Sequence, residues 1–217
     1  MILKVLPVMT NLDMPTNCYI VEDEETKETM VIDPGGEPEK IIDMLDTMRI
    51  DELKYIYLTH CHGDHFGGLL ELKNKKGGKV LIHRDDAEGL YKKEISLTYY
   101  IGMDDIQLEA DSRIDGGDKI HLGNLEFKVI HTPGHTKGGT SLYCEKEGLL
   151  FSGDTLFKGS WGRTDLPTSS IVEIMDSITN KLLKLPDETI VYAGHGHTTR
   201  IREEKPIYLN LEPRLKY

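Results

Sequence analysis

The stretch LTHCHGDHFGG, residues 58–68, decides how the rest of the chain is interpreted. It places three imidazoles and one carboxylate within six residues, after the apolar run YIYL and before a pair of glycines. A divalent metal needs neutral imidazoles and ionised carboxylates on a rigid support, and the end of a strand provides such a support. Because Gly63 lets the backbone bend between the two halves of the stretch, one turn can serve two metals. We therefore predict a metal centre here.

Three later segments repeat the same local pattern of an apolar strand, a turn of small residues and a candidate ligand. In HTPGHT, His135 follows the run LEFKVI; in FSGDT, Asp154 follows LLF; and in AGHGH, His195 follows TIVY. Loops that follow strands can present side chains freely while the strands stay fixed. The recurrence indicates that these loops contribute to the same centre.

Composition limits the classes of function that this chain can have. Its 217 residues suit one domain with a single core, residues 1–217, and its formal charge of −11 argues against a nucleic-acid partner. No apolar run approaches the roughly 20 residues of a membrane span, and the N-terminus has no signal-peptide pattern. The three cysteines are odd in number and widely spaced, which predicts reduced thiols and a cytoplasmic location.

The order of apolar runs predicts strands interleaved with helices, and two sheets flanked by helices are the economical architecture. Pro38 begins one helical pattern, and Ser170 with Glu173 forms a capping box for another that extends to Leu182. Residues 84–113 are polar and mixed, with too little apolar material for a core of their own. We expect them to form a lid-like excursion.

The chain resembles the metallo-β-lactamase-fold hydrolases in four motifs that span most of its length. These are HCHGDH (60–65), TPGHT (132–136), SGDT (152–155) and GHG (194–196). The runs GDTLF (153–157) and GRTD (162–165) are most similar to the glyoxalase II-like branch. The resemblance implies an α/β fold, a four-layer αβ/βα sandwich, with metals at one edge between the sheets.

The resemblance also implies two divalent metal ions per chain, with zinc expected and iron or manganese as alternatives. It would assign His60, His62 and His135 to one metal, Asp64, His65 and His195 to the other, and Asp154 to both. Two such metals can share a water and lower its pKa toward neutrality, so that a bridging hydroxide attacks an acyl carbon. Asp64 would also take part in catalysis by orienting this nucleophile.

Several residues near these motifs are candidates for supporting roles. Asp33, which ends an earlier strand, is a candidate partner for a ligand imidazole, although it could simply cap a turn. His197 flanks a ligand, so an outer role and simple packing stay open. Arg163 and Asp165 lie either on the substrate side or in an ordinary loop ion pair, and Trp161 is a candidate for the same rim.

The leading hypothesis for the activity is hydrolysis of a small thioester or related acyl substrate. Glyoxalase II continues after the last ligand into a helical domain that binds glutathione, whereas only residues 196–217 follow His195 here. We therefore expect weak selectivity for glutathione. The alternative is a persulfide dioxygenase with one iron, held by His60, His135 and Asp154. The metal count distinguishes the two, and the sequence leaves the oligomeric state open.

Overall fold

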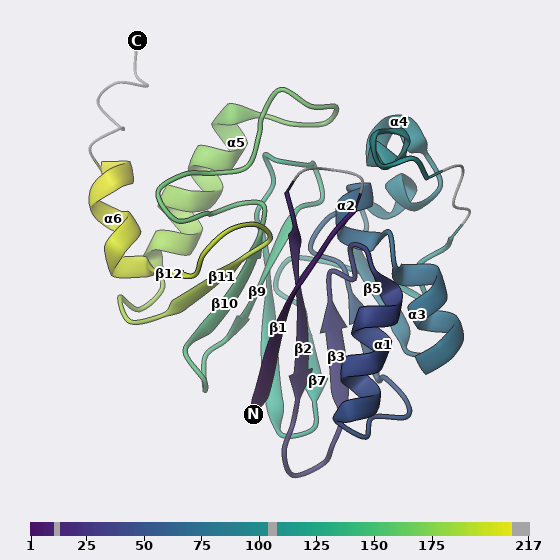
Figure 1. Ribbon diagram of the computed structural model, residues 1–217. Helices are drawn as coiled ribbons and strands as arrows, with labels where there is room; N and C mark the ends of the chain where they lie inside the picture. Colours follow the sequence, from purple (N-terminus) through teal and green to yellow (C-terminus); the bar gives the residue numbers. More distant parts are fainter. Residues whose placement is uncertain (11–13, 104–107, 210–217) are drawn as a thin grey trace.

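The computed structural model describes residues 1–10, 14–103 and 108–209, and its strands form two six-stranded sheets (Figure 1). The first sheet has the order β1-β2-β3-β4-β5-β6. Its strands are β1 (Ile2–Val8), β2 (Thr16–Glu22), β3 (Thr29–Ile32), β4 (Tyr55–Tyr57), β5 (Lys79–His83) and β6 (Ser112–Ile114). The second sheet has the order β12-β11-β10-β9-β8-β7. Its strands are β7 (Lys119–Leu122), β8 (Leu125–His131), β9 (Thr140–Cys144), β10 (Leu149–Gly153), β11 (Ile190–Ala193) and β12 (Thr199–Arg200).

Strand direction determines which loops meet. Strands β3, β4, β5 and β6 pair in parallel, and β10 pairs in parallel with β11, whereas the other pairs are antiparallel. The carboxyl ends of parallel strands share one edge of a sheet, so the loops that leave β3, β4 and β5 emerge together.

Helices cover the outer face of each sheet. The segments beside the first sheet are α1 (Pro38–Thr47), α2 (Gly63–Phe66), α3 (Leu69–Lys76), η1 (Ala87–Leu90), α4 (Lys93–Ser96) and η2 (Thr98–Ile101). Those beside the second are α5 (Ile171–Asp176), the π-helix η3 (Ser177–Lys181), η4 (Leu182–Lys184) and α6 (Ile201–Leu209). None of the helices within the described ranges is long and apolar enough to span a bilayer.

The apolar side chains pack in three layers that alternate with the sheets. Alternation along β2 is clear, since Cys18 and Ile20 face the layer under α1 and Tyr19 and Val21 face the layer between the sheets. The third layer lies between the second sheet and the helices around α5. These layers confirm the predicted four-layer sandwich.

Two predicted elements differ from the structure in extent. The ladder of β4 covers three residues, because the chain turns after Tyr57 toward the ligand loop. Ser170 caps α5 as predicted, its Oγ accepting a bond from the Glu173 N–H at 3.3 Å. The helix then changes to a π turn, in which the Thr179 hydroxyl donates to the Met175 carbonyl at 2.8 Å. Such bonds to the preceding turn bend helices.

The described parts of the segment 84–113 contain η1, α4 and η2, which lie between β5 and β6 in the chain. They pack beside α2 at the end of the sandwich that carries the ligand loops (Figure 1). Residues 104–107 of the expected excursion lie outside the described residues.

Candidate metal centre

The structure brings all seven predicted ligands to one edge of the sandwich, although they come from four separate loops. The loop after β4 and the short helix α2 carry four of them, and the loops after β8, β10 and β11 carry one each. The ligands are His60, His62, Asp64, His65, His135, Asp154 and His195. Six of them are buried and Asp64 is partly exposed, so the loops hold their donor atoms within the molecule.

The first group of ligands consists of three imidazoles. His62 Nδ1 lies 2.8 Å from His135 Nε2, and the His60 ring lies 4.8 Å from each of the other two rings, measured between centroids. The ligand atoms of the three side chains all lie within 4.8 Å of one another. The three nitrogens therefore surround one point.

The second group adds carboxylates to two imidazoles. His195 Nε2 lies 3.3 Å from Asp64 Oδ2, and also 3.3 Å from His65 Nε2. Asp154 faces both groups: its Oδ1 lies 3.4 Å from His65 Nε2, and its Oδ2 lies 3.5 Å from His135 Nε2. Asp154 thus occupies the position of a bridging ligand.

Buried polar atoms without partners support the fit of cations to this site. His60 Nε2, His62 Nε2 and Asp154 Oδ1 are buried and make no hydrogen bond. An unsatisfied buried polar atom costs about 1–3 kcal/mol, so such atoms call for a partner. Imidazole nitrogen and carboxylate oxygen are suitable donors for zinc and iron alike.

Asp33 orients ligands of both groups through one hydrogen-bond network. Its Oδ2 lies 2.9 Å from His65 Nδ1 and accepts a bond of 2.7 Å from the Thr59 hydroxyl. The same hydroxyl lies 3.1 Å from His60 Nδ1, and the Thr59 N–H donates to Asp33 Oδ1 at 2.8 Å. Engaging Nδ1 leaves Nε2 of both histidines for a metal.

Backbone carbonyls orient two further ligands in the same way. His135 Nδ1 donates to the Arg163 carbonyl at 2.8 Å, and His195 Nδ1 donates to the Pro15 carbonyl at 2.9 Å. Each bond selects the tautomer whose Nε2 is free to bind a metal. The GRTD segment therefore contributes to the site through its backbone.

The two groups differ in protonation in the absence of cations. Burial lowers the pKa of His62 to about 3, and burial with neighbouring imidazoles lowers the pKa of His60. Burial also disfavours charge on His195, but Asp154 and Asp64 outweigh it and raise its pKa to about 10. The pKa of His65 is raised too, because three carboxylates outweigh its burial. His60 and His62 of the first group are thus neutral, whereas His65 and His195 of the second hold protons where a cation would bind.

Asp86 is a functional residue that the sequence analysis did not identify. Its buried carboxylate accepts bonds from the Cys61 N–H at 3.1 Å, the Thr136 hydroxyl at 2.6 Å and the Gly138 N–H at 2.6 Å. Cys61 lies between two ligands, and Thr136 follows a third. One carboxylate therefore joins the loop after β4 to the loop after β8 and fixes the geometry of the first group. Its segment of the sequence is polar and carries no recognised motif, so nothing in the sequence indicates this role.

Gly194 shows why the ligand loops contain small residues. A Cβ atom at this position would lie 2.1 Å from Asp154 Oδ1 and 2.6 Å from His65 Cε1. Both distances are far below van der Waals contact, so the position before His195 accommodates no side chain.

A cavity of about 330 Å³ opens over the ligands. Besides ligands, it is lined by Met14, Ser96, Leu97, Tyr100, Ile101, Phe157, Trp161, Arg163 and Leu166. Arg163 and Trp161 thus line the cavity above the candidate ligands, and Arg163 also forms the loop ion pair with Asp165. Asp165 reaches the cavity only through its ion pair with Arg163, and His197 is exposed and does not line it.

A second histidine cluster lies apart from this site. His83 and His131 stack with ring centroids 4.2 Å apart and planes 10° apart, and Asp85 lies beside them. The donor atoms of this cluster also lie within 4.8 Å of one another, but Asp85 is exposed, and His131 Nε2 lies 3.0 Å from the Lys137 carbonyl, so the cluster differs from the buried seven-ligand site.

Comparison with known proteins identifies the class to which this fold and site belong. Residues 12–195 match the model of the metallo-beta-lactamase superfamily, and the chain belongs to that family. Membership and the ligand set support a metal-dependent hydrolase, and the superfamily typically binds two metal ions.

Individual proteins within this superfamily and individual solved structures are also similar to the chain. The chain is 33% identical over 205 residues to the hydroxyacylglutathione hydrolase GloC of Haemophilus influenzae, covering 94% of each chain. Among solved structures it is similar to the BLEG-1 B3 metallo-beta-lactamase, with a TM-score of 0.87, 33% identity and full coverage of both chains. The protein TTHA1623 in a di-iron-bound form gives a TM-score of 0.79 at 32% identity, covering 93% of this chain and 97% of that one. ETHE1 from Myxococcus xanthus gives 0.78 at 27% identity, covering 100% and 92%.

Proposed function

We propose that this protein hydrolyses small thioesters or related acyl compounds with two divalent metal ions. The observation that carries the proposal is the position of Asp154, whose two oxygens face a complete three-ligand group on either side. The similarity to a hydroxyacylglutathione hydrolase supports the thioester as substrate class. Zinc is the proposed ion, and the di-iron-bound relative makes iron the main alternative.

Two bound cations would lower the pKa of a shared water and polarise the substrate carbonyl. The residues of the chain position the participants. Asp64 Oδ2 faces the centre beside His195, and although burial opposes its ionisation, His65 and His195 hold its pKa at about 2. Asp64 is therefore an ionised acceptor for a hydrogen bond from the attacking water. In the hydrolysis a C–O bond forms and the C–S bond breaks; the sulfur leaves as a thiolate with the electron pair and takes up a proton that derives from the water.

A persulfide dioxygenase is the second candidate, and the similarity to ETHE1 favours it. That reading would use one iron held by His60, His135 and Asp154. A mononuclear dioxygenase has no role for the second group, which consists of Asp64, His65 and His195. The donor atoms of this group lie within 4.8 Å of one another, as do those of the first group.

Metal content and two assays test the proposal against this alternative. We expect about two equivalents of metal per chain and turnover of S-lactoylglutathione or of simpler thioesters. A β-lactam belongs in the same panel because of the similarity to BLEG-1. One equivalent of iron, with oxygen uptake on a persulfide and no thioester turnover, would establish the dioxygenase instead.

We also propose that the partners are small molecules and that the protein acts in the cytoplasm. Cys18, Cys61 and Cys144 are buried and unpaired, which suits a reducing compartment. The formal charge of −11 argues against nucleic acid as a substrate. Enrichment of the protein in a periplasmic or secreted fraction would contradict the location.

A further inference from the structure

The cavity above the metal ligands has two apolar walls. Leu97, Tyr100 and Ile101, in and beside η2, line one wall, and Phe157, Trp161 and Leu166 line the other. Apart from the ligands and Arg163, the polar groups of the described lining are the Ser96 hydroxyl, the Tyr100 hydroxyl and the Trp161 indole N–H. A substrate arm between these walls would be removed from water by hydrocarbon and aromatic rings.

The cavity offers a substrate carboxylate little. Arg163 is its one cationic side chain among the described lining residues, and this guanidinium already has a partner. Its Nε donates to Asp165 Oδ1 and its Nη2 donates to Asp165 Oδ2, both at 2.9 Å. This bidentate pair carries no net charge, so the described lining offers an incoming carboxylate no cationic side chain that is not already neutralised.

We propose that the natural substrate is a thioester with an apolar acyl arm and without carboxylates near the cavity, unlike a glutathione conjugate. This rests on the proposed function and names its substrate class. The acyl arm lies between the two walls, with its carbonyl toward the ligands. Hydrolysis consumes one water and gives a carboxylic acid and a thiol, with no change in oxidation state.

A grid of substrates tests the inference with the metal-loaded enzyme. The acyl group is acetyl, butanoyl or hexanoyl, and the thiol is either uncharged N-acetylcysteamine or glutathione. Burial of hydrocarbon predicts that kcat/KM rises about threefold per added methylene until the cavity is full. For the same acyl group, we expect the glutathione thioester to react about tenfold more slowly, because Asp165 already neutralises Arg163, the one cationic side chain of the described lining.

Single-residue variants test which side chains cause the dependence on acyl length and the lower rate with glutathione thioesters. Leu97 has a φ of 60°, a left-handed conformation that asparagine tolerates, so Leu97→Asn changes polarity with little backbone strain. It should flatten the dependence on acyl length, as should Phe157→Ala from the other wall. Asp165→Asn frees the Arg163 guanidinium and should raise the relative rate of the glutathione series severalfold. Leu70→Ala, on the exposed side of α3, is the matched control and should leave both dependences unchanged.

The outcomes separate the inference from the proposed function. If kcat/KM falls with acyl length, or if glutathione thioesters are preferred, the inference is overturned while thioester hydrolysis stands. If neither series reacts, the proposed function fails with it. A steep rise with acyl length that both wall variants flatten would support the inference.

Discussion

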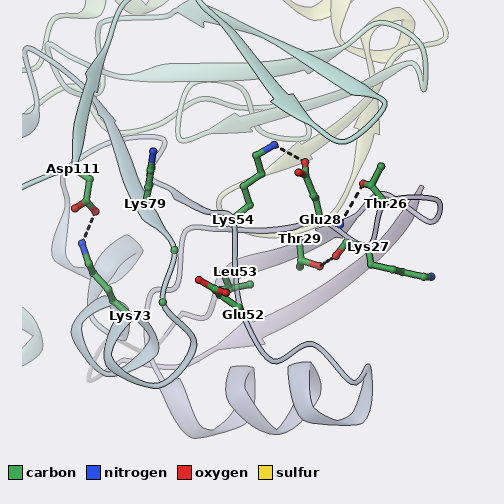
Figure 2. Close-up of a pocket in the computed structure, with 12 residues that line it drawn as sticks. Thr26, Lys27, Glu28, Thr29, Glu52, Leu53, Lys54, Lys73, Lys79 and Asp111 are labelled. Atoms are coloured by element: carbon green, nitrogen blue, oxygen red, sulfur yellow. Dashed lines mark hydrogen bonds and ion pairs between the residues drawn. The ribbon is translucent and has the colours of Figure 1, made fainter.

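The two ends of the same parallel strands carry hollows of opposite character. Loops from the carboxyl ends of β3 and β4 reach the metal centre, where donor atoms are buried and several have no partner. The amino ends of β3, β4 and β5 border a wider hollow of about 640 Å³ (Figure 2). There Lys54 pairs with Glu28 at 2.5 Å, and Lys73 pairs with Asp111.

The difference between these two hollows indicates how a functional site can be recognised in this fold. At the amino end the charges are partly exposed and are neutralised by one another, as on an ordinary surface. At the carboxyl end, glycine-containing loops bring buried imidazoles and carboxylates together at a cost that only a ligand offsets. Convergence of unpaired donors, rather than the size of the hollow, marks the functional end.

The largest effect on the contrast between the two ends of the strands is expected when the negative charge of Asp154 is removed. Asp154→Asn keeps the volume of the side chain but leaves a neutral amide between the two groups. We expect kcat/KM on a thioester to fall roughly 10³-fold or more and the metal content to fall toward one per chain. Elemental analysis and steady-state kinetics measure both. Unchanged metal content together with full activity would show that Asp154 does not bridge.

The pH dependence of metal binding should differ between the two groups of ligands. His195, with a pKa of about 10, must lose a proton to bind a metal, so its group loses affinity as the pH falls. The expected change is about tenfold or more per pH unit. His60 and His62 are already neutral and displace no proton near neutral pH.

Titration of metal-free protein with Co²⁺ between pH 6 and pH 8 checks this difference. We expect the first equivalent to bind with weak pH dependence and the second to require the higher pH. If both groups bind Co²⁺ with the same dependence on pH, the assigned protonation of His195 is contradicted.

Asp86→Asn tests whether the hydrogen bonds of Asp86 to the loops after β4 and β8 affect the affinity for metal. An amide has one oxygen and cannot accept from Cys61, Thr136 and Gly138 as the carboxylate does. We expect a 10- to 100-fold loss of affinity, chiefly at the first group, by Co²⁺ titration. Asp111→Asn, at the amino end, is the matched control for loss of an acid. A change in thermal stability without a change in metal affinity would make Asp86 purely structural.

The smallest effect is expected at the amino end. Lys54→Ala removes the pair with Glu28 and should change the free energy of unfolding by about 1 kcal/mol or less. Urea unfolding measures this, and the metal content and kcat/KM should stay the same. A several-fold loss of activity would show that the hollow in Figure 2 takes part in function.

The fold and the ligands were predictable because each ligand follows a strand and stands in a local motif. The strand before His60 and the turn after it can be recognised without knowledge of the tertiary structure. Asp33 could be inferred as a candidate partner because it ends a strand in the same way.

Other features could not be predicted, because they depend on contacts between distant segments. Asp86 acts on residues 25 and more positions away, and its own segment resembles a polar loop. The sequence left two roles open for Arg163 and Asp165, and only the folded arrangement shows that Arg163 lines the cavity while Asp165 pairs with it from outside the lining. The change from α5 to a π turn is accompanied by a side-chain hydroxyl bond to the preceding turn, and the apolar periodicity of the sequence does not indicate either feature.

The network around Asp33 links the two ligand groups mechanically. One oxygen holds His65 of the second group directly and, through the Thr59 hydroxyl, reaches His60 of the first. A movement of either imidazole is therefore transmitted to the other over a single carboxylate. Filling one half of the centre would therefore stiffen the other half in advance, which would favour binding of the second cation once its ligands have lost their protons.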